Sequence, residues 1–335
     1  MSNYTYIKER DYLFDNCKFF LILLVVVAHF IDFDFSTNWV FKSLYIFIYT
    51  FHMPLFIFIC GVFYSNKNIN EKVLSYIYIF VLQRLMTIIL YQIFNRKYQF
   101  LLFGNDGWHW FLFALAIYNL VLFFAKKTKI EYLLFISFIL SCISGYDNSI
   151  GDMFYLSRIL VFLPYFIAGV VIGKYRINYI SKNKYVFYIS LFVVVLYFIF
   201  CFKFVDVIYK FRPMFAGRNA FSRTEFSNNG GLGRIETHVI SSVIGFAFLM
   251  IIPRCRFGII SLFGQRTLQV YFWHILFRDF FRLTGIREEI CSTLYGKVFW
   301  FIIPIALTFI LSLKFFEWPL NHLRYKNLIN DDIQK

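Results

Sequence analysis

Lys18 and His29 are the two residues of this sequence whose types and spacing best fit a chemical role. Both lie inside the first long apolar run, FDNCKFFLILLVVVAHFIDF. An α-helix turns about 100° per residue, so eleven residues bring His29 back to within about 20° of Lys18, about 16 Å further along the same face. Asp15 falls near the same stripe. Because ionisable groups are expensive inside a bilayer, this stripe predicts a polar track across the membrane that serves chemistry or transport.

Four further polar residues lie inside or at the ends of apolar runs, and each has a structural alternative. His52 is followed by Pro54, which loosens the preceding turn; it either faces a cavity or is a hydrogen-bonded ring in a kinked packing helix. Arg84 lies near the middle of the third run, where a charge costs about 2.5 to 3.5 kcal/mol, so it either binds an anion or pairs with an acidic group. His109 opens the fourth run among aromatic residues that are typical of an interfacial belt. His274 is either a buried hydrogen-bonded ring or a second site residue.

The elements that must position these residues are membrane-spanning helices. Of 335 residues, 60% are hydrophobic and 16% are charged, whereas a soluble domain averages about a quarter charged. Apolar stretches of about 17 to 25 residues, each long enough to cross about 30 Å of hydrocarbon, recur along the whole chain. We predict one domain, 1–335, with no fused extracytoplasmic domain: an all-α integral membrane protein, a bundle of about ten transmembrane helices. The predicted spans are 14–33, 40–64, 74–95, 109–125, 130–146, 154–173, 185–205, 236–252, 268–284 and 297–316.

The net charge of +15 is distributed in a way that argues against nucleic acid as a partner. Lysines and arginines gather in alternate loops, including 126–129, 174–184 and 254–266, whereas most of the intervening loops are poor in bases. This positive-inside pattern predicts that both termini are cytoplasmic. One predicted outer loop, 203–235, breaks the pattern with six bases and no clear helical period. It either closes over a substrate or is an ordinary solvated loop.

The sequence carries no metal-ligand pattern. Its six cysteines are scattered singly, and no CxxC or HExxH motif is present. We therefore predict no metal site. The absence of an internal repeat also disfavours a secondary transporter.

Several stretches resemble the acyltransferase-3 family of membrane acyltransferases. That family has a basic residue, ten intervening residues and a histidine on its first helix, which here are Lys18 and His29. Its aromatic, proline-containing second helix, ending in a small residue and glycine, reads FHMPLFIFICG here, with Cys60 where serine is more usual. A tryptophan- and leucine-rich helix start matches WHWFLFAL, and a late Gly, Leu, Tyr and His pattern matches GQRTLQVYFWH. The resemblance covers essentially the whole chain and is closest to the stand-alone branch of fucose 4-O-acetylase and related acetyltransferases, although the arginine-rich start of the third helix is reduced to Arg84.

The resemblance implies transfer of an acetyl group from cytoplasmic acetyl-CoA to a sugar hydroxyl of a cell-surface polysaccharide, such as a capsule or O-antigen, or of its lipid-linked precursor. Imidazole, with a pKa near 6.5, is a suitable base for a hydroxyl, so His29 either deprotonates it or carries the acyl group itself. Lys18 and Arg84 would supply positive charge to a CoA phosphate or to the oxyanion, and Lys18 is expected to contact the donor. The candidates for substrate binding are His52, His109 and His274.

The expected partners are acetyl-CoA, the glycan or lipid-linked sugar and the lipid bilayer, and the expected location is the bacterial cytoplasmic membrane. A transporter or flippase for an anionic lipid-linked sugar is the alternative, because it would use the same buried side chains without CoA. A structural or scaffold role is disfavoured by the cost of so many intramembrane ionisable groups. The sequence contains no indication of the oligomeric state.

Overall fold

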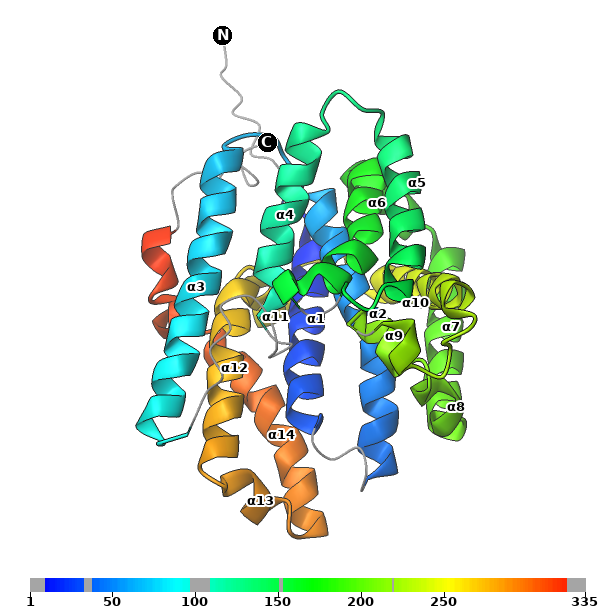
Figure 1. Ribbon diagram of the computed structural model, residues 1–335. Coiled ribbons are helices and arrows are strands. Elements are labelled where there is room, and N and C mark those ends of the chain that lie inside the picture. The colour runs from blue at the N-terminus through cyan, green and yellow to red at the C-terminus, as the bar shows by residue number, and fades with distance from the viewer. Residues whose placement is uncertain (1–9, 33–37, 97–108, 151–152, 219, 324–335) are drawn as a thin grey trace.

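The structure is a computed structural model that describes residues 10–32, 38–96, 109–150, 153–218 and 220–323. These residues form helices joined by short connections, with no strand among them (Figure 1). The α-helices are α1 (Tyr12–Ile31), α2 (Trp39–Val62), α3 (Ile69–Ile93), α4 (Trp110–Phe124), α5 (Ile130–Ile143), α6 (Leu156–Ser181), α7 (Lys184–Lys203), α8 (Val205–Tyr209), α9 (Arg212–Ala216), α10 (Gly230–Ile251), α11 (Gly258–Phe263), α12 (Thr267–Leu283), α13 (Ile286–Ile290) and α14 (Leu294–Leu311). Short 3-10 helices are η1 (Ser144–Tyr146), η2 (Met153–Tyr155), η3 (Phe221–Arg223), η4 (Lys314–Glu317) and η5 (Leu320–Leu323). The all-α prediction is confirmed.

A helix lies over each of the ten predicted spans. Seven of these helices, α1, α2, α3, α6, α7, α10 and α14, are long and apolar enough to cross a membrane, and α4 and α5 are shorter apolar helices. The helix over the ninth predicted span, α12, has 17 residues and carries Arg278, Asp279 and Arg282. Membrane crossing by α12 and the cytoplasmic placement of both chain ends stay predictions.

Two segments differ from what the sequence indicated. Helix α6 extends to Ser181, past the predicted end at 173, but it is kinked at Gly173 (φ 67°, ψ 167°), a non-helical conformation that glycine adopts without a Cβ penalty. The segment 203–235, which shows no clear helical period, contains α8, α9 and η3, and α10 begins inside it at Gly230. This segment is folded and packs against the bundle.

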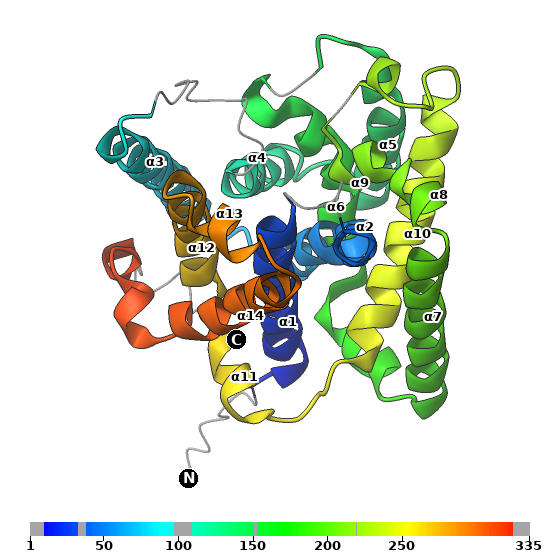
Figure 2. The same cartoon turned by 90° about the horizontal axis from the view of Figure 1, so that it is seen from below.

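Helices α1 and α2 lie in the middle of the bundle. Figure 2 shows them between α3, α12 and α14 on one side and α5, α7 and α10 on the other. Within its most apolar stretch, 78% of α1 is buried, compared with 17% of α7. Since both helices are apolar, the difference marks α1 as an interior helix and α7 as a peripheral helix whose apolar surface lies on the outside of the bundle.

Helices α2 and α6 touch through two glycines. A Cβ added at Gly61 would overlap the backbone carbonyl of Phe166, and one added at Gly169 would overlap the carbonyl of Phe58. Small residues allow such close backbone approach between helices in membranes. Gly61 ends the motif FHMPLFIFICG, so helix packing explains that glycine.

The proline inside α2 exposes a carbonyl that another helix uses. Pro54 has no N–H and so cannot donate to the carbonyl of Thr50, one turn earlier. Ser241 of α10 donates its hydroxyl to this oxygen at 2.5 Å. The backbone group is therefore satisfied within the bundle, as a water-poor environment requires.

Candidate active site

A cavity of about 420 Å³ lies among α1, α2, α4, α6, α9 and α12. Helix α1 and the residue that follows it line the cavity at positions three or four apart, namely Lys18, Ile22, Val25, His29 and Asp32. This row is the stripe predicted from the spacing of Lys18 and His29, and it places both side chains in one cavity. Helix α2 supplies a second row, which consists of Tyr45, Tyr49, His52, Met53, Phe56 and Cys60. The volume falls within the range of small-molecule sites, about 300 to 1,000 Å³.

A second histidine, from α12, holds His29 in place. The Nδ1 of His29 lies 3.1 Å from the Nε2 of His274, and the ring centroids are 5.1 Å apart. The Nδ1 of His274 lies 3.0 Å from the carbonyl oxygen of Val270, which only an N–H can approach as a donor. In neutral His274 the Nε2 therefore carries the lone pair and accepts the Nδ1–H of His29. In neutral His29 the basic nitrogen is then Nε2.

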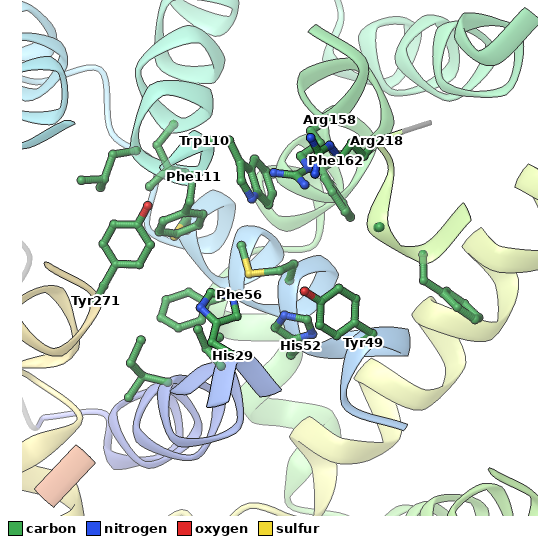
Figure 3. A pocket seen from close by; sticks show the side chains of 18 of the residues that line it. His29, Tyr49, His52, Phe56, Trp110, Phe111, Arg158, Phe162, Arg218 and Tyr271 are labelled. Atoms are coloured by element: carbon green, nitrogen blue, oxygen red, sulfur yellow. The ribbon is translucent and has the colours of Figure 1, made fainter. Parts of the chain in front are cut away.

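His52 is fixed in the same way by its own helix. Its Nδ1 lies 2.8 Å from the carbonyl oxygen of Ile48, one turn earlier, so the Nε2 of the neutral ring carries the lone pair. The ring also lies beside Tyr49, with centroids 5.0 Å apart. Figure 3 shows His29 and His52 along the same wall of the cavity. This wall thus carries two imidazoles, each held through Nδ1.

Lys18 lies at the other end of the α1 stripe within a cluster of charges. Its Nζ is 3.0 Å from Asp15, whose carboxylate also accepts a hydrogen bond from Arg10 Nε at 2.7 Å. Lys18 and Lys174 both lie over the ring of Phe63, each with Nζ 5.8 Å from its centroid. Because Arg10 and Lys18 share one carboxylate, positive charge exceeds negative charge at this site, which suits an anionic ligand.

Arg84 and His109 contact each other. The Nη1 of Arg84 is 3.4 Å from the Nδ1 of His109, and the Oγ1 of Thr87 is 3.3 Å from His109 Nε2. A guanidinium only donates, so His109 Nδ1 accepts and its Nε2–H donates to Thr87. The pair joins α3 to the start of α4. The motif WHWFLFAL begins at 108, which lies outside the described residues.

The structure therefore divides the six predicted site residues into three groups. The described residues that line the cavity include Lys18, His29 and His52. His274 lies behind His29 as its hydrogen-bond partner. Arg84 and His109 are paired elsewhere and are not among the described lining residues.

An arginine from the 203–235 segment lines the cavity near Asp32, the residue that follows α1. The Nη2 of Arg212 is 3.7 Å from the Asp32 carboxylate and 3.4 Å from the hydroxyl of Tyr45. Its guanidinium also lies over the Tyr45 ring, 5.5 Å from the centroid. The segment that the sequence assigned to a loop thus forms part of the site.

Two more arginines lie across the cavity from the histidines. Arg158, in the first turn of α6, is 7% exposed and stacks over Trp110, with its guanidinium carbon 5.2 Å from the ring centroid. Arg218 follows α9 and also lines the cavity. Figure 3 shows Arg158 and Arg218 side by side near Phe162, opposite His29.

Sequence reasoning missed these three arginines as site residues. Arg158 lies near the start of an apolar run, and a base at that position is normally interpreted only as the boundary of a membrane span. Arg212 and Arg218 lie in a segment without helical periodicity. The available signal was the unusual number of bases in that predicted outer loop.

This arrangement suits proton abstraction from a neutral nucleophile in the presence of an anionic reactant. The imidazole of His29 lines a space that has cationic side chains at both ends of the α1 stripe. Within the part of the chain that the structure describes, no three His, Cys, Asp or Glu side chains gather in a group that could hold a metal ion.

The apolar helices and this cavity indicate a multi-pass membrane protein with a cavity that is lined in part by ionisable side chains. The model of the acyltransferase-3 family, described as an acyltransferase domain, matches residues 11–317. The chain belongs to this family and is therefore a membrane acyltransferase. Comparison with curated proteins and with solved structures finds no match. The narrower resemblance to fucose 4-O-acetylase stays a prediction.

Proposed function

We propose that this acyltransferase is an O-acetyltransferase. It moves an acetyl group from cytoplasmic acetyl-CoA to a sugar hydroxyl of a cell-surface polysaccharide or of its lipid-linked precursor, in the cytoplasmic membrane of a bacterium. The observation that supports the proposal most is the His29 ring, which lines the cavity while its Nδ1 is held by His274. A sugar hydroxyl is a poor nucleophile and needs such a base.

In the proposed reaction His29 acts as a general base and then as a general acid. Its Nε2 takes the hydroxyl proton while the hydroxyl oxygen attacks the thioester carbonyl carbon. The carbon–sulfur bond breaks, the sulfur leaves as the CoA thiolate, and this thiolate takes the proton from Nε2. While His29 is protonated at both nitrogens, the lone pair of His274 Nε2 still accepts its Nδ1–H and stabilises the positive charge.

We assign Lys18 to the donor. The positive-inside pattern puts the start of α1 toward the cytoplasm, where acetyl-CoA is present. Lys18 lines the cavity there, and the shared Asp15 carboxylate leaves an excess of positive charge for an anionic CoA phosphate. Arg84 contacts His109 and is not among the described residues that line the cavity, so its role in the reaction stays a prediction.

The proposal is tested by His29→Ala in the full chain, incorporated into nanodiscs and supplied with labelled acetyl-CoA and surface glycan. Removal of a general base should lower the transfer rate by about 10²- to 10⁴-fold. The matched control is His238→Ala, because His238 is a buried histidine of α10 that is bonded to Ser141 and Tyr165 and is not among the described lining residues. This control should keep transfer within about threefold, since its loss affects packing alone.

Mass spectrometry of glycans from cells that carry each variant separates the enzyme from a transporter. Loss of O-acetyl groups with continued polymer export supports the acyltransferase assignment. Full O-acetylation by His29→Ala would overturn it. Labelled acetyl bound to wild-type protein in the absence of acceptor would show that Nε2 carries the acyl group itself, in place of direct transfer.

A further inference from the structure

We propose that Arg158 and Arg218 form an anion subsite, so that the acceptor carries a phosphate or carboxylate group in addition to the hydroxyl that is acylated. This inference rests on the function proposed above and names the class of acceptor. It assigns a role to Arg158 and Arg218, which lie outside the sequence motifs and outside the first helix.

The charges of the cavity favour an anionic ligand. The described lining residues include four bases, Lys18, Arg158, Arg212 and Arg218, and one acid, Asp32. Four positive charges against one negative charge make this set net positive by three. Positive side chains in a poorly hydrated site attract an anion strongly, because the effective dielectric constant is low there.

A backbone contact places Arg158 and Arg218 next to each other. Ser157 donates its hydroxyl to the carbonyl oxygen of Gly217 at 2.8 Å. Each of these residues immediately precedes one of the two arginines. The hydrogen bond between α6 and the end of α9 therefore brings the backbones of the two arginines close together, and their side chains lie near each other in Figure 3.

Gly217 is suited to this turn. Its φ of 63° lies in the left-handed region that favours glycine. A Cβ added there would lie 3.1 Å from side-chain atoms of Phe162 and Val161, which is tighter than ordinary contact. The chain thus turns out of α9 in a way that brings Arg218 to the cavity.

Helix α10 holds α9 from the other side. Arg234 is 1% exposed and donates from Nη1 to the carbonyl oxygen of Met214 in α9. Its guanidinium also lies over the ring of Phe221, 5.7 Å from the centroid. Arg234 is therefore a positioning residue for α9, and the subsite belongs to a fixed part of the fold.

The geometry of Arg158 matches arginine sites for oxyanions. Stacking on Trp110 covers one face of the guanidinium, while its N–H donors lie in the plane of the group. A carboxylate or phosphate can accept charge-assisted hydrogen bonds from two neighbouring guanidiniums at once.

The subsite lies toward the His29 end of the cavity. Arg212, in the same α9 segment as Arg218, pairs with Asp32 three residues after His29, whereas Lys18 is eleven residues before His29 on α1. We therefore assign the arginine pair to the acceptor and not to the donor.

The test compares wild-type protein in nanodiscs with the double variant Arg158→Gln, Arg218→Gln. The acceptors share a glucopyranose ring and differ in the group that it carries: methyl glucoside, methyl glucuronide, glucose 1-phosphate and a polyprenyl diphosphate-linked glucose. The double variant should raise KM by about tenfold or more for the preferred anionic acceptor, because charge-assisted hydrogen bonds are lost. Its KM values for methyl glucoside and for acetyl-CoA should change less than about twofold. The anionic acceptor that the wild type prefers identifies the group as a carboxylate, a sugar phosphate or a lipid diphosphate.

Two variants serve as controls. Arg223→Gln removes an exposed arginine of η3 in the same segment and should leave every KM unchanged. Arg158→Lys with Arg218→Lys keeps both charges and should retain part of the preference for the anionic acceptor, which separates a folding defect from loss of charge.

Three outcomes would overturn the subsite: no preference of the wild type for anionic acceptors, an equal rise in KM for charged and neutral acceptors, or a rise confined to acetyl-CoA. If the wild type transfers acetyl to no acceptor, the proposed function fails and the subsite is judged by binding. Pyrophosphate or glucuronate should then raise the unfolding temperature of the wild type and of Arg223→Gln, but not that of the double glutamine variant. Equal stabilisation of all three proteins would refute the subsite on its own.

Discussion

Replacing His274 by phenylalanine tests whether the histidine pair determines the reactivity of His29. The variant keeps an aromatic ring at a position that is 0% exposed, and it removes the nitrogen that accepts the Nδ1–H of His29. A buried donor left without an acceptor costs about 1 to 3 kcal/mol. The His29 ring then escapes this cost by rotating or by moving its proton to Nε2, and either change removes the basic nitrogen from the cavity.

The size of the expected effect follows from that energy. If the bond to His274 favours the reactive form of His29 by about 1 to 3 kcal/mol, its loss lowers kcat by about 5- to 150-fold. This decrease in kcat is smaller than the decrease expected when the base itself is removed, which is about 10²- to 10⁴-fold. KM for the acceptor should stay unchanged, because His274 is not among the described lining residues.

Initial rates of labelled acetyl transfer in nanodiscs measure this effect. His274→Gln supplies a carbonyl oxygen that can accept the same hydrogen bond, so it should recover part of the rate lost in His274→Phe. His238→Phe removes a buried histidine elsewhere and controls for changes in packing. A His274→Phe variant with wild-type kcat, or with an altered KM and an unaltered kcat, would refute the proposed role of the pair.

Two further predictions concern helix packing and donor binding. Gly61→Ala should destabilise the protein by about 1 to 3 kcal/mol, because the added methyl group overlaps the Phe166 carbonyl. Gly245→Ala, whose Cβ would meet the nearest side chain at 3.6 Å, should have little effect, and equal unfolding temperatures of the two variants would contradict this account. Lys18→Ala should raise KM for acetyl-CoA by about two- to fivefold, as expected for one partly solvated charge contact. Steady-state rates check this against Lys67→Ala, an exposed lysine of the α2–α3 connection, and an effect confined to the acceptor would exclude Lys18 as a donor contact.

The helices and one row of the cavity could be predicted from the sequence because both depend on local properties. Hydrophobic stretches of sufficient length give the helix positions, and the 3.6-residue period puts Lys18 and His29 on one face of α1. The burial of Arg84 could also be predicted, because this residue lies within an apolar run of the sequence. It is 1% exposed in the structure.

The partners of these residues could not be predicted in the same way, because they come from distant parts of the chain. His274 is 245 residues from His29, and Gly217 is 60 residues from Ser157. The free-energy cost of a charge inside a membrane span shows that Arg84 needs a partner. It does not show whether that partner is a substrate or His109. The choice depends on tertiary packing.

Two glycines in the sequence motifs connect this packing to the chemistry. A Cβ at Gly264 would overlap the carbonyl of Asp15, just as one at Gly61 would overlap a carbonyl of α6. The contact at Gly264 fixes the chain that enters α12 against the start of α1, and so determines how far along α1 the ring of His274 lies. The Gly264 contact therefore bears on the register in which His29 of α1 meets His274 of α12. The Gly61 contact instead holds α2, which carries His52, against α6. Close backbone packing at the two motif glycines thus helps to position the histidines, although neither glycine is among the described residues that line the cavity.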